Sequence, residues 1–402
     1  MHRVDNLFEW IVSDENLLTA IIEVNKSHRW MTHHKPNRCV AWIEETFDER
    51  VRELRKIITD GFVQTKPKRK RRYDPSAQKW RDINEPLLWP DQYVHHALIQ
   101  VLKPIFMRGM DKYCCGSIEG RGTHYGKAAI ERWMRHDPAG TKYCEELDIR
   151  HFYDSLQPSV VMARMRSLIK DARVLDLIWR IVKDGVLIGS YCSQWFANVV
   201  LQPLDQIIRQ SGLCKYYVRY MDNFTIKGPN KRKLHQLRHV IEDWLRAHRL
   251  TLKGNWQVFS TRLKVKRRSD GTVIVRRSKR KNPCRPRLPS ALGYRYGHSF
   301  TLLRKHNLIR LKRYVNRFRK RRRQGRRVLA GNAAGLLSRF GQLKHCNNYE
   351  IYRRILRGEK IQRQLKSIIR QSNRRELLTW STFLEQRARW KSSRSKVQAA
   401  PT

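Results

Sequence analysis

Two stretches near the middle of the chain, YCEELDIRHFY at residues 143–153 and YYVRYMDNFTIK at residues 216–227, decide the fold class. Both are rich in aromatic and β-branched residues, which favour strands, and the second is interrupted by a Met-Asp-Asn turn. Each places an aspartate, Asp148 or Asp222, at a strand edge or turn. Because residues 154–181 between them have helical spacing, the sequence predicts an α+β fold.

The charge balance indicates a nucleic-acid partner. The 402 residues include 85 Lys and Arg against 35 Asp and Glu, a formal charge of +50, while 40% are hydrophobic and can form a core. Such a surface attracts polyanions. The longest uncharged stretch, residues 185–204, contains Ser, Gln, Asn and Pro, so no transmembrane helix and no membrane partner are predicted.

The setting is predicted to be the cytoplasm. The amino-terminal residues MHRVDNLFEW lack the apolar run and small-residue cleavage site of a secretory signal. The eight cysteines form no CxxC pair, which favours reduced thiols over a zinc ribbon or a disulfide framework.

Three flanking segments have their own patterns. Residues 66–72 hold six cations beside a proline, which suits an exposed hairpin or loop. A second hairpin is predicted over residues 263–275, where Ser-Asp-Gly supplies the turn. Residues 304–327 contain 13 Lys or Arg around an apolar stripe, which predicts a helix with one dry face and one basic face.

Paired aspartates on neighbouring strand edges suit a two-metal phosphoryl-transfer site. Mg²⁺ prefers carboxylate oxygen and must be held against a triphosphate. Asp148 and Asp222 are the candidates. Taken alone, acids at such positions are more often turn or capping residues, so their surroundings have to decide.

The motifs along the chain resemble those of reverse transcriptases. DIRHFYDSL at 148–156 resembles the palm strand whose first aspartate binds both metals, and YVRYMDNF at 217–224 resembles the YxDD turn. GVLIGSYCSQWFANVVL at 185–201 is similar to the loop and helix that contact template and nucleotide. Two fingers segments, the motif after the catalytic turn, the primer grip and a thumb segment find matches, in that order, at 81–98, 116–126, 250–259, 291–297 and 341–349.

The resemblance covers some two thirds of the chain, from about Arg81 to Tyr349, and implies a right-hand polymerase with fingers, a palm built on an antiparallel sheet and a helical thumb. The expected parts are an N-terminal helical extension at 1–62, fingers at 63–142, a palm with fingers insertions at 143–300, a basic helical thumb at 301–385 and a flexible tail at 386–402. The implied reaction is synthesis of cDNA from a template RNA and deoxynucleoside triphosphates.

The resemblance also implies roles for single residues. Asp148 and Asp222 would bind Mg²⁺, or Mn²⁺ in its place, with help from the backbone carbonyl of Ile149. Asn223 completes the catalytic turn, and Lys253 matches the proton donor to pyrophosphate. A solvated cation is the plainer alternative for Lys253.

Further positions are expected to contact the substrates. Tyr153 matches the aromatic residue that stacks under the incoming sugar and excludes a 2′-hydroxyl, although a core aromatic is its plainer reading. Arg121 would contact the template backbone, with turn stabilisation as the rival. The predicted nucleotide-binding residues are Arg81, Tyr153, Ile188, Gly189, Ser193 and Gln194, and the predicted template or primer contacts are Arg121, Gly122, Leu292, Gly293 and Tyr294.

The loop IGSYCSQ at 188–194 narrows the resemblance. Most reverse transcriptases have QGxxxSP here, whereas IGxxxSQ resembles the enzymes of diversity-generating retroelements, which copy a template RNA with errors at adenines. Ile188 removes a polar contact to the incoming nucleotide, and looser base selection follows because discrimination needs differential contacts. A small basic accessory oligomer is then an expected partner.

The catalytic turn departs from the family pattern. It is Tyr220-Met221-Asp222-Asn223 instead of YxDD, so one carboxylate is replaced by an uncharged amide and weaker metal binding is expected. Certain viral RNA polymerases with the same type of palm use a GDN turn and remain active, so catalysis is predicted here.

Other functions stay open. The alternatives are another bacterial reverse transcriptase, acting in phage defence or like a group II intron enzyme, and a catalytically impaired, polymerase-like RNA-binding protein. No integrase, RNase H or HNH-like motif follows the thumb segment, which disfavours an intron enzyme with its own endonuclease.

Overall fold

The computed structural model describes residues 3–29, 36–74, 79–263, 265–267, 273–275, 286–347, 357 and 359–374. The chain divides into two compact units, one of residues 1–20 and 54–304 and the other of residues 21–53 and 305–402. The fold is mixed α/β with antiparallel sheets, as the sequence predicts. The predicted tail at 386–402 lies outside the described residues.

The first unit is organised around a four-stranded sheet in the order β4-β5-β3-β6, with every neighbouring pair antiparallel. Its strands are β3 (Tyr143–Asp148), β4 (Tyr216–Tyr220), β5 (Asn223–Gly228) and β6 (Gln257–Ser260). The two stretches that decide the fold class therefore pair side by side, and the predicted strands on either side of the Met-Asp-Asn turn are confirmed.

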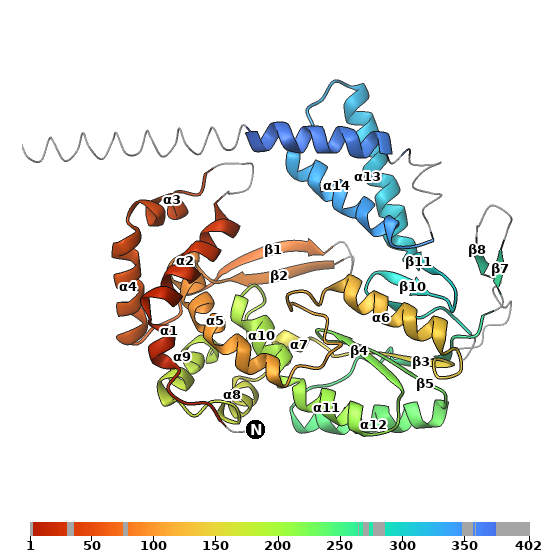
Figure 1. Cartoon of the computed structure of the whole chain (residues 1–402), viewed down its shortest axis with the longest axis horizontal. Coiled ribbons are helices and arrows are strands. Elements are labelled where there is room, and N and C mark those ends of the chain that lie inside the picture. The colour runs from red at the N-terminus through yellow and green to blue at the C-terminus, as the bar shows by residue number, and fades with distance from the viewer. Residues whose placement is uncertain are drawn as a thin grey trace, which may run out of the picture. The chain divides into compact units, whose positions relative to one another are not determined.

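Helices cover both faces of this sheet. In Figure 1 α6 (Thr123–His136) lies over one face, and α11 (Gln202–Gln210) with α12 (Lys231–Ala247) over the other. Trp133 of α6 stacks on Tyr216 of β4, with ring centroids 4.9 Å apart. Because side chains alternate along a strand, Glu146 and Asp148 point to the α6 face of the sheet and Glu145 to the α12 face.

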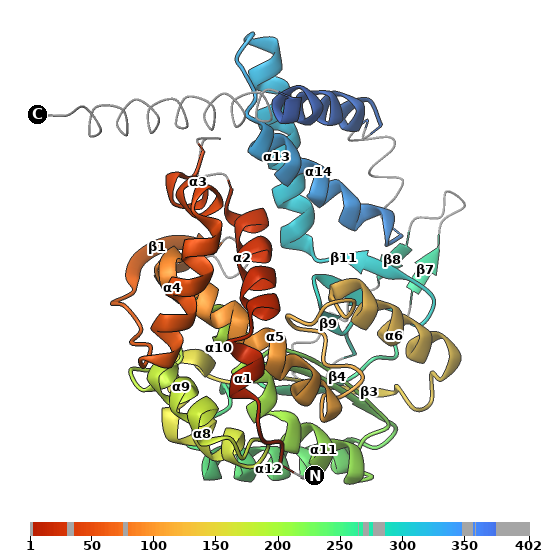
Figure 2. The ribbon, with the colours of Figure 1, turned by 60° about the vertical axis from the view of Figure 1, so that its left-hand side comes forward.

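The other helices of the first unit pack around the sheet. Figure 2 shows α1 beside α5. In the first turn of α2, the Asn16 side chain donates to the Ala97 carbonyl of α5 at 3.0 Å. The Asp171 carboxylate caps α9 and also accepts from the backbone N–H groups of Leu7 and Phe8, which fastens the amino-terminal residues to this unit. The bounds are α1 (Phe8–Ile11), α2 (Asp14–His28, which begins in this unit), α5 (Tyr93–Arg108), α7 (Phe152–Ser155), α8 (Pro158–Arg166), α9 (Ala172–Val182) and α10 (Tyr191–Val200).

Hairpins form the remaining strands. The basic segment at 66–72 enters a long antiparallel hairpin of β1 (Lys68–Asp74) and β2 (Lys79–Glu85). The hairpin predicted over residues 263–275 is also present, although its Ser-Asp-Gly turn lies outside the described residues. A three-stranded sheet completes the unit, and the remaining bounds are β7 (Val265–Arg267), β8 (Val273–Val275), β9 (Ser290–Ala291), β10 (Tyr294–Tyr296) and β11 (Thr301–Leu303).

The second unit is helical. Its basic helix α13 buries Leu311, Val315 and Phe318 on one side, which confirms the predicted dry face. The guanidinium of Arg339 lies 4.3 Å from the ring centroid of Tyr314, so a cation–π contact links α14 to α13. The bounds are α3 (Arg38–Glu45), α4 (Phe47–Thr59, which ends in the first unit), α13 (Lys305–Arg323) and α14 (Ala330–Lys344), and residues 359–374 are also helical.

Within the described part of the chain, none of the helices has the length and apolar character needed to cross a membrane.

One core position of the central sheet is occupied by an ionisable residue, Glu145. Glu145 of β3 is fully buried under α12, and neither carboxylate oxygen has a hydrogen-bond partner. Burial raises the pKa of the Glu145 carboxyl to about 8, with the charge of Arg238 opposing the rise and that of Glu242 adding to it. The side chain is therefore protonated in the folded protein near neutral pH.

Glu145→Gln is expected to stabilise the protein at pH 8 and to make little difference near pH 4.5. The unfolded chain releases the proton near pH 4.5 and the folded chain near pH 8, so the wild type loses stability as the pH rises between these values. The gain at pH 8 should be about 1–3 kcal/mol, measured by denaturant unfolding across the pH range. Glu119→Gln, at a highly exposed carboxylate, is the control and should show no such trend. A pH-independent effect of Glu145→Gln would disprove this account of the core.

Candidate active site

The sheet register brings the two predicted aspartates together. Asp148, the last residue of β3, pairs with Asn223, the first residue of β5. Asp222 precedes Asn223 in the turn between β4 and β5, and its carbonyl accepts a hydrogen bond from the Ile149 N–H at 3.1 Å. Met221 has a left-handed φ of 53°, which lets the chain reverse within two residues. Both aspartates thus occupy one end of the central sheet.

Lys253 belongs to the same site. Its Nζ donates to Asp148 Oδ2 at 2.6 Å, and its backbone N–H donates to the Asp148 carbonyl at 2.8 Å. The other oxygen, Asp148 Oδ1, is buried and has no hydrogen-bond partner. An unpartnered anionic oxygen beneath the surface is costly, so this atom suits a cation ligand.

Asp222 is held beside a like charge. Burial raises the pKa of its carboxyl, and the negative charge of Asp148 raises it further. The exposed Asn223 amide donates to Asp222 Oδ1 at 3.0 Å, where a second aspartate would instead repel it. Two neighbouring carboxylates, one with an unpartnered buried oxygen, fit a divalent cation, and Asp148 and Asp222 would hold it.

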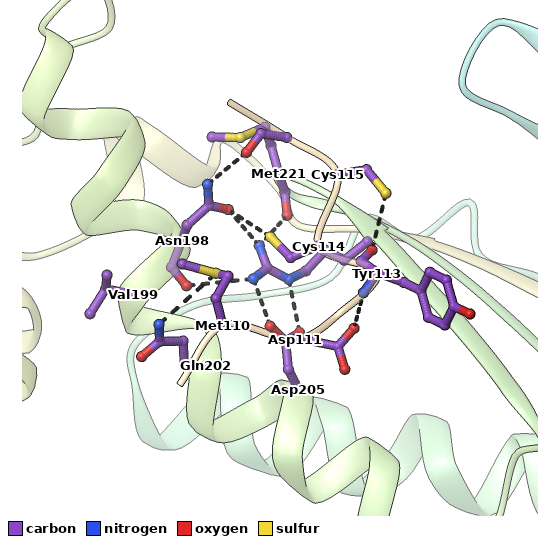
Figure 3. Close-up of polar contacts among 12 residues, drawn as sticks. Met110, Asp111, Tyr113, Cys114, Cys115, Asn198, Val199, Gln202, Asp205 and Met221 are labelled. Carbon is purple, nitrogen blue, oxygen red and sulfur yellow. Dashed lines mark hydrogen bonds and ion pairs between the residues drawn. The ribbon is translucent and has the colours of Figure 1, made fainter. Parts of the chain in front are cut away.

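A buried polar network supports the turn from below (Figure 3). Arg219 of β4 is fully buried and makes a two-pronged ion pair with Asp205 of α11, with Nε–Oδ1 and Nη2–Oδ2 distances of 2.8 and 2.7 Å. Its Nη1 donates to Asn198 Oδ1 at 2.9 Å and to the Met221 carbonyl at 3.1 Å. The network therefore ties the Met-Asp-Asn turn to two core helices.

The loop before α6 closes this network. Asn198 Nδ2 donates to the Gly116 carbonyl at 2.9 Å. Gly116 lies so close to the turn that a Cβ there would come within 2.5 Å of the Met221 sulfur and 2.7 Å of the Met221 backbone nitrogen. A side chain at this position would displace the turn, which explains the glycine.

The predicted nucleotide-binding residues come from three elements. Burial raises the pKa of Tyr153 on α7, and the charge of Asp222 raises it further. Tyr153 and Ile188 line one pocket of about 470 Å³, together with Asn84 of β2. Gly189, with a left-handed φ of 110°, packs against β2.

Three other predicted nucleotide contacts do not line this pocket. Ser193 is buried within α10, whereas Gln194 is exposed on the same helix. Arg81 is exposed on β2 and does not line the pocket that holds Tyr153. Their roles as nucleotide ligands stay predictions.

The predicted template and primer contacts lie around α6. Arg121 donates to the Asp111 carbonyl at 3.1 Å, which is the turn-stabilising arrangement that rivals a template contact, and the exposed Gly122 caps α6. Leu292 and Gly293 form the left-handed turn between β9 and β10. Tyr294 follows them and is 2% exposed, so its side chain belongs to the core.

The network around Arg219 is absent from the sequence-based prediction. A signal for it exists, because strand alternation places Arg219 on the same side of β4 as the buried Tyr217. An arginine at a core position needs an acid nearby, yet the sequence does not show that Asp205 is that acid.

Comparison with known proteins assigns the family. Residues 66–266, half of the chain, match the family described as reverse transcriptase (RNA-dependent DNA polymerase), and the chain belongs to this family. Reverse transcriptases copy template RNA and generally use divalent metals.

A curated relative and two solved structures are similar over part of their length. Protein YkfC of Escherichia coli (strain K12) is 24% identical over 193 residues, which are 44% of this chain and 50% of the relative. Apo telomerase from Candida tropicalis, truncated from its C-terminal domain, is 12% identical with a TM-score of 0.38, covering 63% of this chain and 58% of its own. Telomerase from Candida albicans, in complex with a fragment of telomeric RNA, is 11% identical with a TM-score of 0.40, covering 83% and 64%. This chain thus spans less than two thirds of each.

Asp205→Ala is expected to lower the free energy of unfolding by about 3–5 kcal/mol, because it leaves the buried guanidinium of Arg219 without its counter-ion. Urea unfolding of the full chain measures this. Asp176→Ala is the matched control, since it removes the acid of an exposed pair with Arg180 and should cost less than about 1 kcal/mol. Equal losses in the two variants would show that the network does not hold the turn.

Proposed function

We propose that this protein is an active RNA-directed DNA polymerase that makes cDNA by two-metal nucleotidyl transfer. The observation that carries the proposal is the meeting of Asp148 and Asp222 at one end of an antiparallel sheet, with Asp148 Oδ1 buried and unpartnered. Family membership supports the reaction class.

The proposed architecture is the right hand of polymerases. The four-stranded sheet would be the palm, within residues 143–300, and the β1–β2 hairpin would belong to fingers at 63–142. The basic helix α13 would begin a thumb at 301–385, after an N-terminal extension at 1–62. The antiparallel sheet and the dry and basic faces of α13 favour this assignment.

The side chains around the Met-Asp-Asn turn would have separate roles in the reaction. Asp148 and Asp222, with the Ile149 carbonyl, would bind two Mg²⁺ or Mn²⁺ ions, which when bound neutralise the triphosphate and stabilise charge at the α-phosphate. Lys253 would give a proton to the departing pyrophosphate, since its ammonium already lies within the site. Tyr153 would stack under the sugar and reject a 2′-hydroxyl.

The remaining contacts are proposed from the resemblance to the family. Arg81 would grip the triphosphate, and Ile188, Gly189, Ser193 and Gln194 would face the incoming nucleotide. Arg121, Gly122, Leu292, Gly293 and Tyr294 would contact template or primer, with Tyr294 limited to its backbone because the ring is buried.

Replacement of Asp222 or Asp148 by Ala is expected to reduce primer extension by roughly a thousandfold or more, because each supplies a metal ligand. Asn223→Asp should preserve or raise activity and lower the Mg²⁺ concentration required. The measurement is deoxynucleotide incorporation on a defined RNA template with Mg²⁺ and with Mn²⁺.

Asp243→Ala, at an exposed acid of α12, is the control and should keep wild-type activity. Incorporation by Asp222→Ala at the wild-type rate would remove the polymerase proposal. In that case a non-catalytic RNA-binding protein becomes the better account, and Asn223, which leaves the turn with a single carboxylate, is the observation that favours it.

We further propose that the enzyme serves a diversity-generating retroelement, with a small basic accessory oligomer as partner. The support is the IGxxxSQ loop, in which Ile188 has no polar group to offer the incoming base. Other bacterial reverse transcriptases, in phage defence or like those of group II introns, are the alternatives. A near-repeat pair of genes that differ at adenines, close to the coding sequence, would separate them.

Sequencing of cDNA made on a defined RNA is expected to show errors concentrated opposite template adenines. Ile188→Gln should lower that error frequency by about tenfold, because a restored polar contact adds discrimination on the order of 1–3 kcal/mol. Ile22→Gln, at an exposed position of α2, introduces the same side chain elsewhere and should change nothing. Uniform errors that Ile188→Gln leaves unaltered would argue against a retroelement role, though not against polymerisation.

A further inference from the structure

The two faces of the β1–β2 hairpin carry different side chains. The register places Tyr73 opposite Trp80, and strand alternation puts Arg69 and Arg71 on their side. Arg69, Arg71, Tyr73 and Trp80 are called the aromatic face below, and Asp82 and Asn84 of β2 lie on the same side. The opposite face carries the pair Arg72–Arg81 and Ile83. Ile83 approaches Gly189, since a Cβ on that glycine would lie 3.0 Å from the Ile83 Cγ2 atom.

The two rings of the aromatic face do not line the pocket that holds Tyr153. Arg81, the proposed triphosphate contact, lies on the face shared with Ile83, which turns toward the Ile188–Gly189 loop. Tyr73 and Trp80 point the other way. On the same side of β2 as Trp80, Asp82 and Asn84 line the pocket that holds Tyr153, whereas the two rings lie farther along the hairpin and outside that pocket.

The two rings of the aromatic face are exposed. Tyr73 is 48% and Trp80 58% accessible, and their ring centroids lie 5.4 Å apart at an interplanar angle of 64°. The guanidinium of Arg71 lies 5.7 Å from the Trp80 ring centroid. This fold leaves the two large rings largely uncovered by other side chains. Exposed apolar surface of this size indicates a binding partner, here one with flat apolar surfaces.

The charge around these rings selects an anionic partner. β1 and β2 together contain seven cations and three acids. Two of the acids are already engaged, Asp82 by Arg69 at 2.8 Å and Glu85 by Arg72 at 2.7 Å. A second copy of the chain is a poor occupant, because two surfaces of a protein with a charge of +50 repel one another.

The base of the hairpin is fixed. Buried Asp91 accepts hydrogen bonds from the backbone N–H of Thr65 at 3.3 Å, from its hydroxyl at 2.5 Å, and from the backbone N–H of Leu87 at 3.2 Å. These residues flank the hairpin on both sides, so a single carboxylate fastens both of its ends. A ring held on an anchored strand pair binds with less loss of conformational entropy than one on a loose loop.

We propose that the aromatic face is a stacking platform for unpaired bases of RNA outside the RNA–DNA hybrid, a choice of ligand that rests on the proposed function. Bases present flat π surfaces to Tyr73 and Trp80, while phosphates meet the neighbouring arginines. Duplex RNA is a poor ligand here, because its bases are already stacked on one another. The platform recognises single-stranded character with little regard to sequence.

Fluorescence anisotropy with the full chain and a labelled, unstructured RNA of about 15 nucleotides tests the platform. Trp80→Ala is expected to weaken binding about tenfold, and Trp80→Phe, which keeps a ring, should stay close to the wild type. Trp10→Ala removes an even more exposed tryptophan, on α1, and should have no effect. A blunt RNA duplex should bind all four proteins equally.

Wild-type affinity in Trp80→Ala would overturn the proposal, and so would an equal loss for single-stranded and duplex RNA. The assay contains no deoxynucleotides and can be repeated in the Asp148→Ala background, where the Trp80→Ala effect should persist. Failure of the platform is thereby distinguished from failure of catalysis. Matching circular dichroism and melting temperatures of the variants exclude misfolding as the cause of lost binding.

Discussion

The guanidinium of Arg219 is fully buried beneath the Met-Asp-Asn turn, and all of its N–H donors must find acceptors inside the protein. It finds them on Asp205, on Asn198 and at the Met221 carbonyl, which belong to two helices and the turn itself. Because an unpaired buried charge costs several kcal/mol, none of these elements can shift alone. The position of Asp222 is therefore set by the core.

The site follows from this constraint and from the sheet register. Pairing of Asp148 with Asn223 places one aspartate at the end of β3 and the other in the adjoining turn. The negative charges of Asp148 and Asp222 repel each other. Lys253 offsets only part of that repulsion, because it hydrogen-bonds only one oxygen of Asp148. A chain of the reverse transcriptase family thus carries a rigid site that suits divalent cations.

The sequence predicts local secondary structure better than the tertiary contacts that each element makes. The strands around Asp222, the hairpins and the basic helix α13 are predictable because each depends on spacing within a short segment. The burial of Glu145 and the pairing of Arg219 with Asp205 are not, since they depend on which helix covers which face of the sheet. The family resemblance points to Asp148 and Asp222 as candidate metal ligands, but it does not show which side chains fix their positions.

Binding of Mn²⁺ to the full chain, followed by electron paramagnetic resonance, tests the central claim most directly. The wild type should bind Mn²⁺ at a site that Asp148→Asn and Asp222→Asn each weaken by at least about tenfold, because both carboxylates act as ligands. Unchanged Mn²⁺ affinity in both variants would mean that the two aspartates do not form a metal site.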